Sequence, residues 1–138
     1  MTVDAMTALA ANDTNSPQWS DTSFVGCLHE CHRWDEQAYF CFEAALFDLC
    51  KARVTDPNAR KMIDRVAARV FSYVMLMFSC HFDPCDGFKI ENLGDDALRT
   101  WRGRLQLVFE GFFANDMPAQ DTLSPPNASH MSDLRAVR

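Results

Sequence analysis

The sequence predicts an all-α protein, a small bundle of three main helices with disordered tails at both ends, and three observations indicate this class. The stretch 66–82, VAARVFSYVMLMFSCHF, is apolar along most of its length. On either side of it, apolar residues recur at spacings of three and four, which is the period of an α-helix. Between these regions, Thr55-Asp56-Pro57 has the pattern with which helices begin.

The middle helix is the element around which the others are expected to pack. Within residues 70–78, eight of nine side chains are apolar or aromatic, and Ser72 is the exception. A helix that spans a bilayer needs about 20 apolar residues, so this segment is too short, and Arg69 interrupts it upstream. We therefore predict a buried helix over 57–80, with Asp56 as its N-cap and a proline in its first turn.

The first helix is expected over residues 22–52, which contain no proline and a single glycine, Gly26. Its apolar residues form a broad stripe suited to a helix that faces the core: Phe24, Leu28, Cys31, Ala38, Phe42, Ala45, Leu46 and Leu49. An unbroken helix of about 30 residues would be roughly 45 Å long. That length leaves two alternatives, one continuous helix or two helices divided near residues 33–37.

The third helix is expected over residues 95–113, because two acids suit its positively polarised start and apolar residues follow at helical spacing. Turn residues in 81–93 predict the loop that joins it to the middle helix. Residues 1–15 and 115–138 have little apolar periodicity and are predicted to be flexible tails. The single domain predicted between the tails covers residues 16–114.

Composition limits the classes of function and the compartment. The formal net charge of −6 argues against nucleic-acid binding, which needs a basic surface. The N-terminal region lacks the basic residues and the long apolar core of a secretory signal, and no stretch is long enough for a transmembrane helix. We expect a cytoplasmic protein that binds neither nucleic acid nor membrane, with its six cysteines reduced.

Motifs for catalysis are not found in the sequence. The five glycines form neither a G-x-G-x-x-G nor a Walker pattern, and G-x-S-x-G is absent. Residues 28–32, LHECH, resemble H-E-x-x-H only superficially, since the second histidine follows the first by three residues instead of four. We therefore expect that the protein is not an enzyme and carries no cofactor.

Cysteine and histidine residues occur near the expected ends of the first two helices. If those helices are antiparallel, four of these residues could approach one another and form a tetrahedral zinc site, namely Cys27, Cys31, His81 and either Cys80 or Cys85. No pair of cysteines has the C-x2-C spacing typical of zinc sites. We predict no metal, and we interpret the thiols as small side chains of a helical core.

Acidic residues and a cluster of phenylalanines are the candidates for contact with a partner. Residues 21–50 contain six acids and one base, whereas 51–69 contain six bases and two acids. This segregation predicts either attraction between the first two helices or an acidic face for a basic partner. The phenylalanines near Gly111 belong either to the core or to a partner or homodimer interface. The candidate partner-binding residues are Glu30, Asp35, Glu36, Glu43, Phe112 and Phe113.

These observations favour a small acidic binding protein that inhibits or neutralises a protein partner, as inhibitor and immunity-type proteins do. Charge complementarity would accelerate its association with a basic target such as a nuclease toxin. Two alternatives stay open. The first is a metal or thiol-redox sensor that uses the Cys and His group, and the second is a secretion chaperone or adaptor that binds an extended segment along an apolar groove.

Overall fold

A computed structural model describes residues 2–123 of the chain, and these residues contain five α-helices, one 3₁₀ helix and no β-strand. The helices are α1 (Thr2–Ala10), α2 (Phe24–Cys31), α3 (Glu36–Thr55), α4 (Pro57–Phe82), α5 (Asp95–Ala114) and the 3₁₀ helix η1 (Gln120–Thr122). The all-α prediction is confirmed for this part of the chain, but the helices are more numerous than the three main ones predicted. The chain divides into two units, Met1–Asn92 and Leu93–Arg138, and this boundary lies inside the single domain predicted over 16–114.

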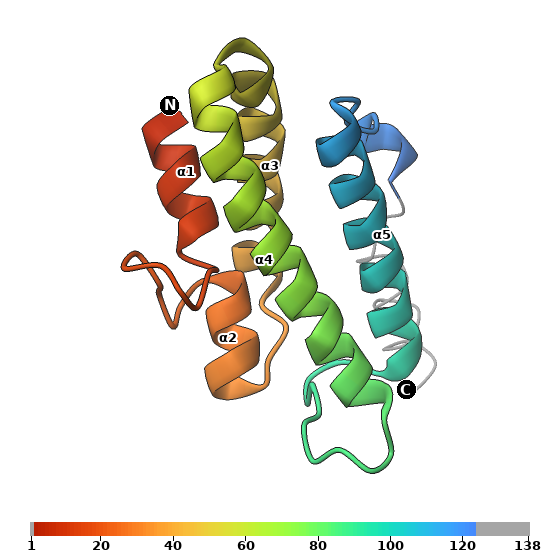
Figure 1. Cartoon of the computed structure of the whole chain (residues 1–138). Coiled ribbons are helices and arrows are strands. Elements are labelled where there is room, and N and C mark those ends of the chain that lie inside the picture. The colour runs from red at the N-terminus through yellow and green to blue at the C-terminus, as the bar shows by residue number, and fades with distance from the viewer. Residues whose placement is uncertain (1, 124–138) are drawn as a thin grey trace. The chain divides into compact units, whose positions relative to one another are not determined.

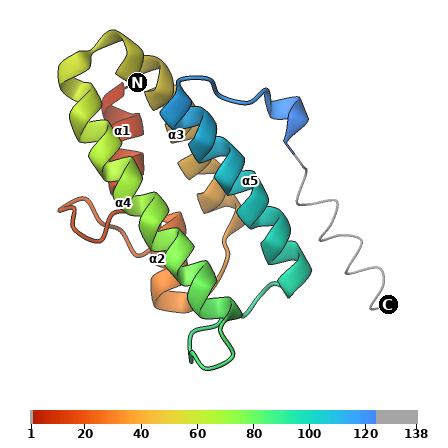
Figure 2. The same cartoon turned by 45° about the vertical axis from the view of Figure 1, so that its right-hand side comes forward.

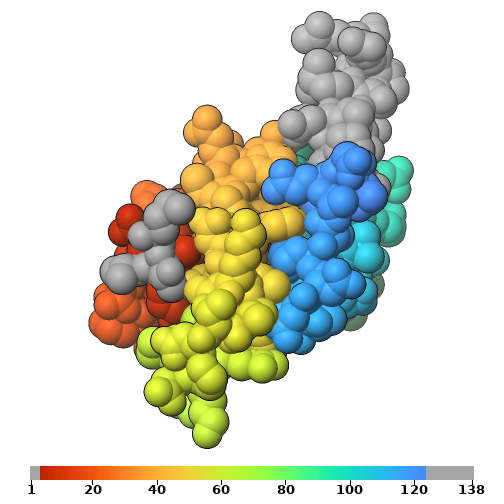
Figure 3. All heavy atoms as spheres, turned by 90° about the horizontal axis from the view of Figure 1, so that it is seen from above, coloured from red at the N-terminus to blue at the C-terminus, as the bar shows by residue number. Residues whose placement is uncertain are grey.

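Unit 1 is built on the pair α3 and α4, which run side by side in opposite directions (Figures 1 and 2). Helix α1 packs against both members of the pair, and α2 packs against α3. The turn between α3 and α4 lies at the end of unit 1 that faces the viewer in Figure 3. Val54, in the last turn of α3, is 59% exposed. The core of unit 1 therefore lies between four helices, with α3 contacting each of the other three.

Helix α4 begins as the sequence predicts and ends two residues later than predicted. The Asp56 side chain accepts hydrogen bonds from the backbone N–H groups of Asn58 and Ala59, at 3.0 and 3.3 Å. The predicted apolar row is buried: Ile63, Val66, Val70, Val74 and Met77. The second half of α4 is not covered on every side, because Leu76 is 55% exposed. Among the described residues, no helix has both the length and the apolarity that crossing a membrane requires.

The region predicted as the first helix is two helices, separated by residues 32–35. His32 ends α2 in the left-handed conformation, with φ 54° and ψ 35°. Asp35 then begins α3, since its side chain accepts from the backbone N–H of Ala38 at 2.9 Å. The second of the two sequence alternatives is thus confirmed, and the break overlaps the predicted range 33–37.

The Asn92 side chain, distant in sequence, holds the backbone of the break through hydrogen bonds. Its Oδ1 accepts from the backbone N–H of Trp34 at 2.8 Å, and its Nδ2 donates to the Trp34 carbonyl at 2.9 Å. In addition, the backbone N–H of Glu91 donates to the His32 carbonyl at 2.8 Å. These bonds satisfy backbone groups that no helix can satisfy at this point.

Replacing Asn92 by alanine is expected to destabilise unit 1 by about 1–2 kcal/mol, because two backbone groups of the buried Trp34 lose their partners. Asn58→Ala is the matched control, since no hydrogen bond involves the Asn58 side chain and its effect should stay within about 0.5 kcal/mol. Urea unfolding followed by circular dichroism measures both. Equal stability of the two variants would show that solvent replaces the Asn92 amide without cost.

An aromatic cluster joins the break to the helices around it. The ring centroid of Phe24 lies 4.8 Å from that of Trp34, 5.2 Å from that of Tyr39 and 5.4 Å from that of Phe42. Trp34 also lies 5.8 Å from Phe78 of α4. All five side chains are buried, so they give the irregular segment a rigid apolar anchor.

The prediction of a flexible tail over residues 1–15 was wrong, because Thr2–Ala10 form helix α1. The sequence contains the signal for it, because Ala5 and Leu9, and also Met6 and Ala10, are four residues apart. Leu9 is fully buried, and the following Asn12 accepts from the backbone N–H of Val25 at 2.9 Å. Packing of this short apolar stripe on α3 and α4 stabilises a helix that propensity alone would leave marginal.

Unit 2 contains α5 and the segment after it. Helix α5 matches the predicted range 95–113 to within one residue, and it ends at Asn115 in the left-handed conformation with φ 58°. The chain then turns back on the helix, since the backbone N–H of Asp116 donates to the Gly111 carbonyl at 2.8 Å. The predicted tail over 115–138 therefore begins with an ordered turn, and residues 124–138 lie outside the described part.

Candidate partner-binding surface

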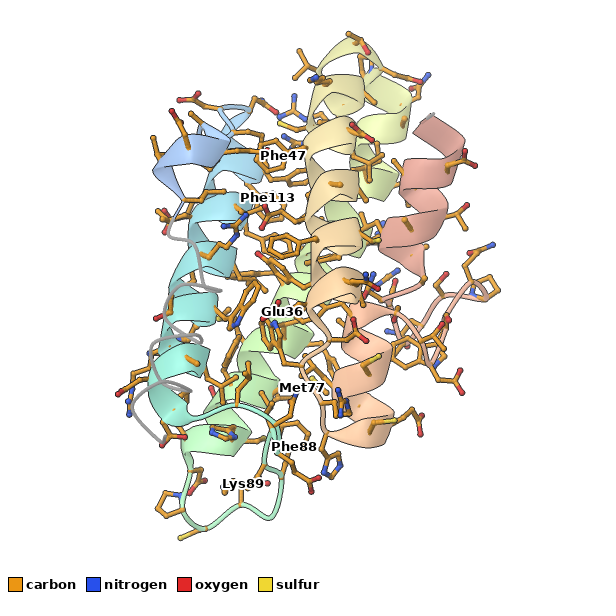
Figure 4. The ribbon with its side chains drawn as sticks, turned by 180° about the vertical axis from the view of Figure 1, so that it is seen from behind. Glu36, Phe47, Met77, Phe88, Lys89 and Phe113 are labelled. Atoms are coloured by element: carbon orange, nitrogen blue, oxygen red, sulfur yellow. The ribbon has the colours of Figure 1, made fainter. Side chains whose placement is uncertain are left out.

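Three of the predicted acidic residues lie at the break between α2 and α3. Glu30 is in the last turn of α2 and is exposed, Asp35 caps α3, and Glu36 begins that helix (Figure 4). Glu91, which the sequence did not single out, lies beside them because of its backbone bond to His32. We call Glu30, Asp35, Glu36 and Glu91 the acidic junction.

Imidazoles are the neighbours of the two most exposed carboxylates in the acidic junction. Glu30 lies 3.8 Å from Nε2 of His29, and Glu91 lies 3.8 Å from Nδ1 of His32. Their side chains are 51% and 69% exposed, and neither is within ion-pair distance of a lysine or arginine among residues 2–123. Because exposed carboxylates of this kind keep their charge available, the junction can attract a cationic surface.

Two predicted partner-binding residues are not on the surface. Glu43 is 3% exposed and Phe112 is fully buried, so neither can contact a partner in this structure. Glu43 stands on the same row of α3 as the buried Tyr39, Leu46 and Cys50, at spacings of three and four, and this row faces the core. Phe113, by contrast, is 38% exposed (Figure 4).

His29 connects α2 to α4 next to the junction. Its Nδ1 is hydrogen-bonded to the Tyr73 hydroxyl at 2.5 Å, and its ring meets Trp19 edge-on with centroids 5.8 Å apart. The pKa of Tyr73 is raised, first by burial and then by the nearby Cys80 and Glu30. A neutral Tyr73 hydroxyl therefore stays available for this bond, which holds the end of α2 that carries Glu30.

The predicted metal candidates are divided among separate surroundings. Cys31 and Cys85 are exposed, and the Cys27 thiol approaches the Thr22 carbonyl at 3.8 Å. His81 is buried, and its Nδ1 accepts from the backbone N–H of Ile90 at 2.9 Å. Cys80 donates to Asp86. No three of the His, Cys, Asp or Glu side chains in the described part of the chain form a group that could hold a metal ion.

The loop after α4 is organised by Lys89 (Figure 4). The Lys89 ammonium donates to the carbonyl oxygens of Asp83 and Asp86 at 2.9 and 3.0 Å, and to that of Cys80 at 3.5 Å. Hydrogen bonds from the Phe88 backbone N–H and from Cys80 lower the pKa of Asp86. The loop thus closes on itself and presents Glu91 and Asn92 to the break between α2 and α3.

Comparisons of the chain with protein families, curated proteins and solved structures found no match.

Proposed function

We propose that this protein is a small acidic binding protein that inhibits or neutralises a basic protein partner, and that it contacts the partner through the acidic junction. The observation that carries the proposal is the exposure of Glu30 and Glu91, whose charges no described lysine or arginine neutralises. The net charge of −6 extends the same attraction over the whole molecule. Inhibition then consists of covering the functional site of the partner.

The surroundings of the junction suit a preformed binding surface. Asn92 and Glu91 fix the break through backbone hydrogen bonds, and the aromatic cluster around Phe24 anchors it from inside. A surface held in this way loses little conformational entropy on binding, which favours affinity. Electrostatic steering adds to the association rate more than to the lifetime of the complex.

Reversing the two exposed charges is expected to slow capture of the partner by about tenfold at low salt, because charge reversal at an interface rim acts mainly on association. The partner is first isolated with the tagged full chain from the native host and identified by mass spectrometry. Association rates are then measured by surface plasmon resonance for Glu30→Lys/Glu91→Lys at low and high ionic strength. The difference from the unmodified protein should shrink as salt rises.

Asp48→Lys/Asp4→Lys is the matched control, since it makes the same total charge change at exposed positions of unit 1 outside the junction. Glu36 and Asp48 are on one helix and separated by about 18 Å along its axis. Association that slows equally in both double variants would show a net-charge effect without a specific surface. Failure to isolate a stoichiometric basic partner would contradict the function itself.

A further inference from the structure

A shallow apolar groove lies between α1 and α4, two helices that are neighbours in unit 1 (Figure 1). Its volume is about 400 Å³, and its lining includes Met6 and Ala10 of α1 and Met62 and Ile63 of α4. Met62 is a large apolar side chain of this lining, and it is 57% exposed. Methionine is flexible and polarizable, and it adapts to apolar side chains of different shape.

The rim of the groove is cationic, although the protein as a whole is acidic. A second hollow of about 510 Å³ continues the first, since both are lined by Met6, Ala10 and Met62, and Lys61 and Arg65 line this second part. Lys61 and Arg65 are exposed and lie one turn apart on α4. No hydrogen bond or ion pair joins either side chain to another residue among 2–123.

The acidic residue that lines the groove does not neutralise this rim. Asp13 is 2% exposed, and its Oδ2 accepts from Nη2 and Nε of Arg69 at 2.7 and 3.1 Å. Its Oδ1 accepts from the backbone N–H of Asn15 at 3.0 Å. Asp13 and Arg69 therefore satisfy each other, and the charges of Lys61 and Arg65 remain for an external group.

We propose that this groove binds an amphipathic helix of a partner protein, with its apolar face on Met62 and with carboxylates along its edge. An apolar hollow between two helices that includes methionines is the type of surface that receives such a helix. Two cations one turn apart match two carboxylates at i and i+4 on a bound helix. The inference concerns other residues than the acidic junction and does not depend on the proposed function.

A synthetic peptide pair tests the proposal directly with the full chain. Both peptides carry leucines at i, i+3, i+4 and i+7, and one has glutamates and the other lysines along the edges of that stripe. In fluorescence anisotropy, the glutamate peptide should bind and the lysine peptide should bind at least about tenfold more weakly, because its charges repel those of the rim. Backbone NMR shifts caused by the glutamate peptide should fall on α1 and α4.

Variants of the protein separate the groove from general charge effects. Lys61→Glu/Arg65→Glu should weaken binding of the glutamate peptide by roughly tenfold and improve that of the lysine peptide. Lys51→Glu/Arg33→Glu makes the same charge change at exposed positions outside the groove lining, so it is the matched control and should change little. Met62→Glu should abolish binding, whereas Met62→Leu should retain it, and an unchanged circular-dichroism spectrum and Tm of Met62→Glu exclude loss of folding as the cause.

Three outcomes would overturn the proposal. The first is that the glutamate peptide does not bind, and the second is that it binds equally well after Lys61 and Arg65 are reversed. The third is self-association: sedimentation of the unmodified protein shows a dimer, and Met62→Glu converts it to a monomer. In that case a second copy of the chain occupies the groove.

Discussion

Replacing Gly26 by alanine is expected to destabilise the protein by about 3 kcal/mol or more, the upper part of the range for steric overpacking. A Cβ at this position would lie 2.2 Å from the Ser20 carbonyl oxygen and 2.6 Å from the Asp21 carbonyl carbon. Both atoms belong to the backbone, so no side chain can rotate away. The turn before α2 would have to move, and with it the Ser23 cap that accepts from the Gly26 N–H at 2.9 Å.

Thermal unfolding followed by circular dichroism measures this effect, with a fall in Tm of roughly 10 °C expected. Gly103→Ala is the matched control, because a Cβ at Gly103 would meet no atom within 4 Å and the residue lies inside α5. Alanine should stabilise that helix by about 0.5–1 kcal/mol. A Gly26→Ala variant as stable as the unmodified protein would show that the close approach of the turn is not required.

Replacing Asp64 by alanine should destabilise unit 1 by about 3 kcal/mol, because it removes a carboxylate from a buried cation. Arg53 is 2% exposed, and its Nη2 and Nε lie 2.6 and 2.7 Å from Oδ1 of Asp64. Water cannot readily replace the lost partner at a side chain so well covered. Urea unfolding of the purified variant gives the change in the free energy of unfolding.

Asp64 has a second cationic neighbour, Arg60, which serves as the comparison for Arg53. Arg60 lies 3.7 Å from the other oxygen of Asp64, but its side chain is 47% exposed. Arg60→Ala should therefore change stability by less than about 1 kcal/mol, as is usual for an ion pair at the surface. Equal effects of Asp64→Ala and Arg60→Ala would mean that burial of Arg53 has no energetic consequence.

Local sequence signals account for most of the helix boundaries. Asp56 and Pro57 mark the start of α4, and the acids at Asp95 and Asp96 mark that of α5, because each satisfies the exposed amides or the dipole of a first turn. At the break, Asp35 is a local cap for α3, but the backbone of His32 and Trp34 is held by long-range bonds from Glu91 and Asn92, which no local pattern contains. The sequence signal for α1 consists of only two pairs of apolar residues four positions apart, and the helix is stabilised by packing on α3 and α4.

The burial of Glu43 was not predicted, for a related reason. Glu43 and Arg53 are charged residues on a row of α3 that faces the core, and a charge alone does not reveal that a position is buried. Their place on that row, at helical spacing from Tyr39 and Leu46, is the signal that could have identified them. The position of the groove was not predicted, because it needs α1 beside α4 and residues 1–15 were expected to be a flexible tail.

The Lys89 ammonium, enclosed by three carbonyl oxygens, has a consequence for covalent labelling of the protein. The chain contains three lysines, Lys51, Lys61 and Lys89, and the first two are exposed. The amine of a lysine must leave its hydrogen bonds before it can attack an acylating reagent, so Lys89 should react slowly while Lys51 and Lys61 react fast. A lysine-directed photo-crosslinker would therefore be installed beside Met62 with a single competing exposed lysine, which Lys51→Arg removes.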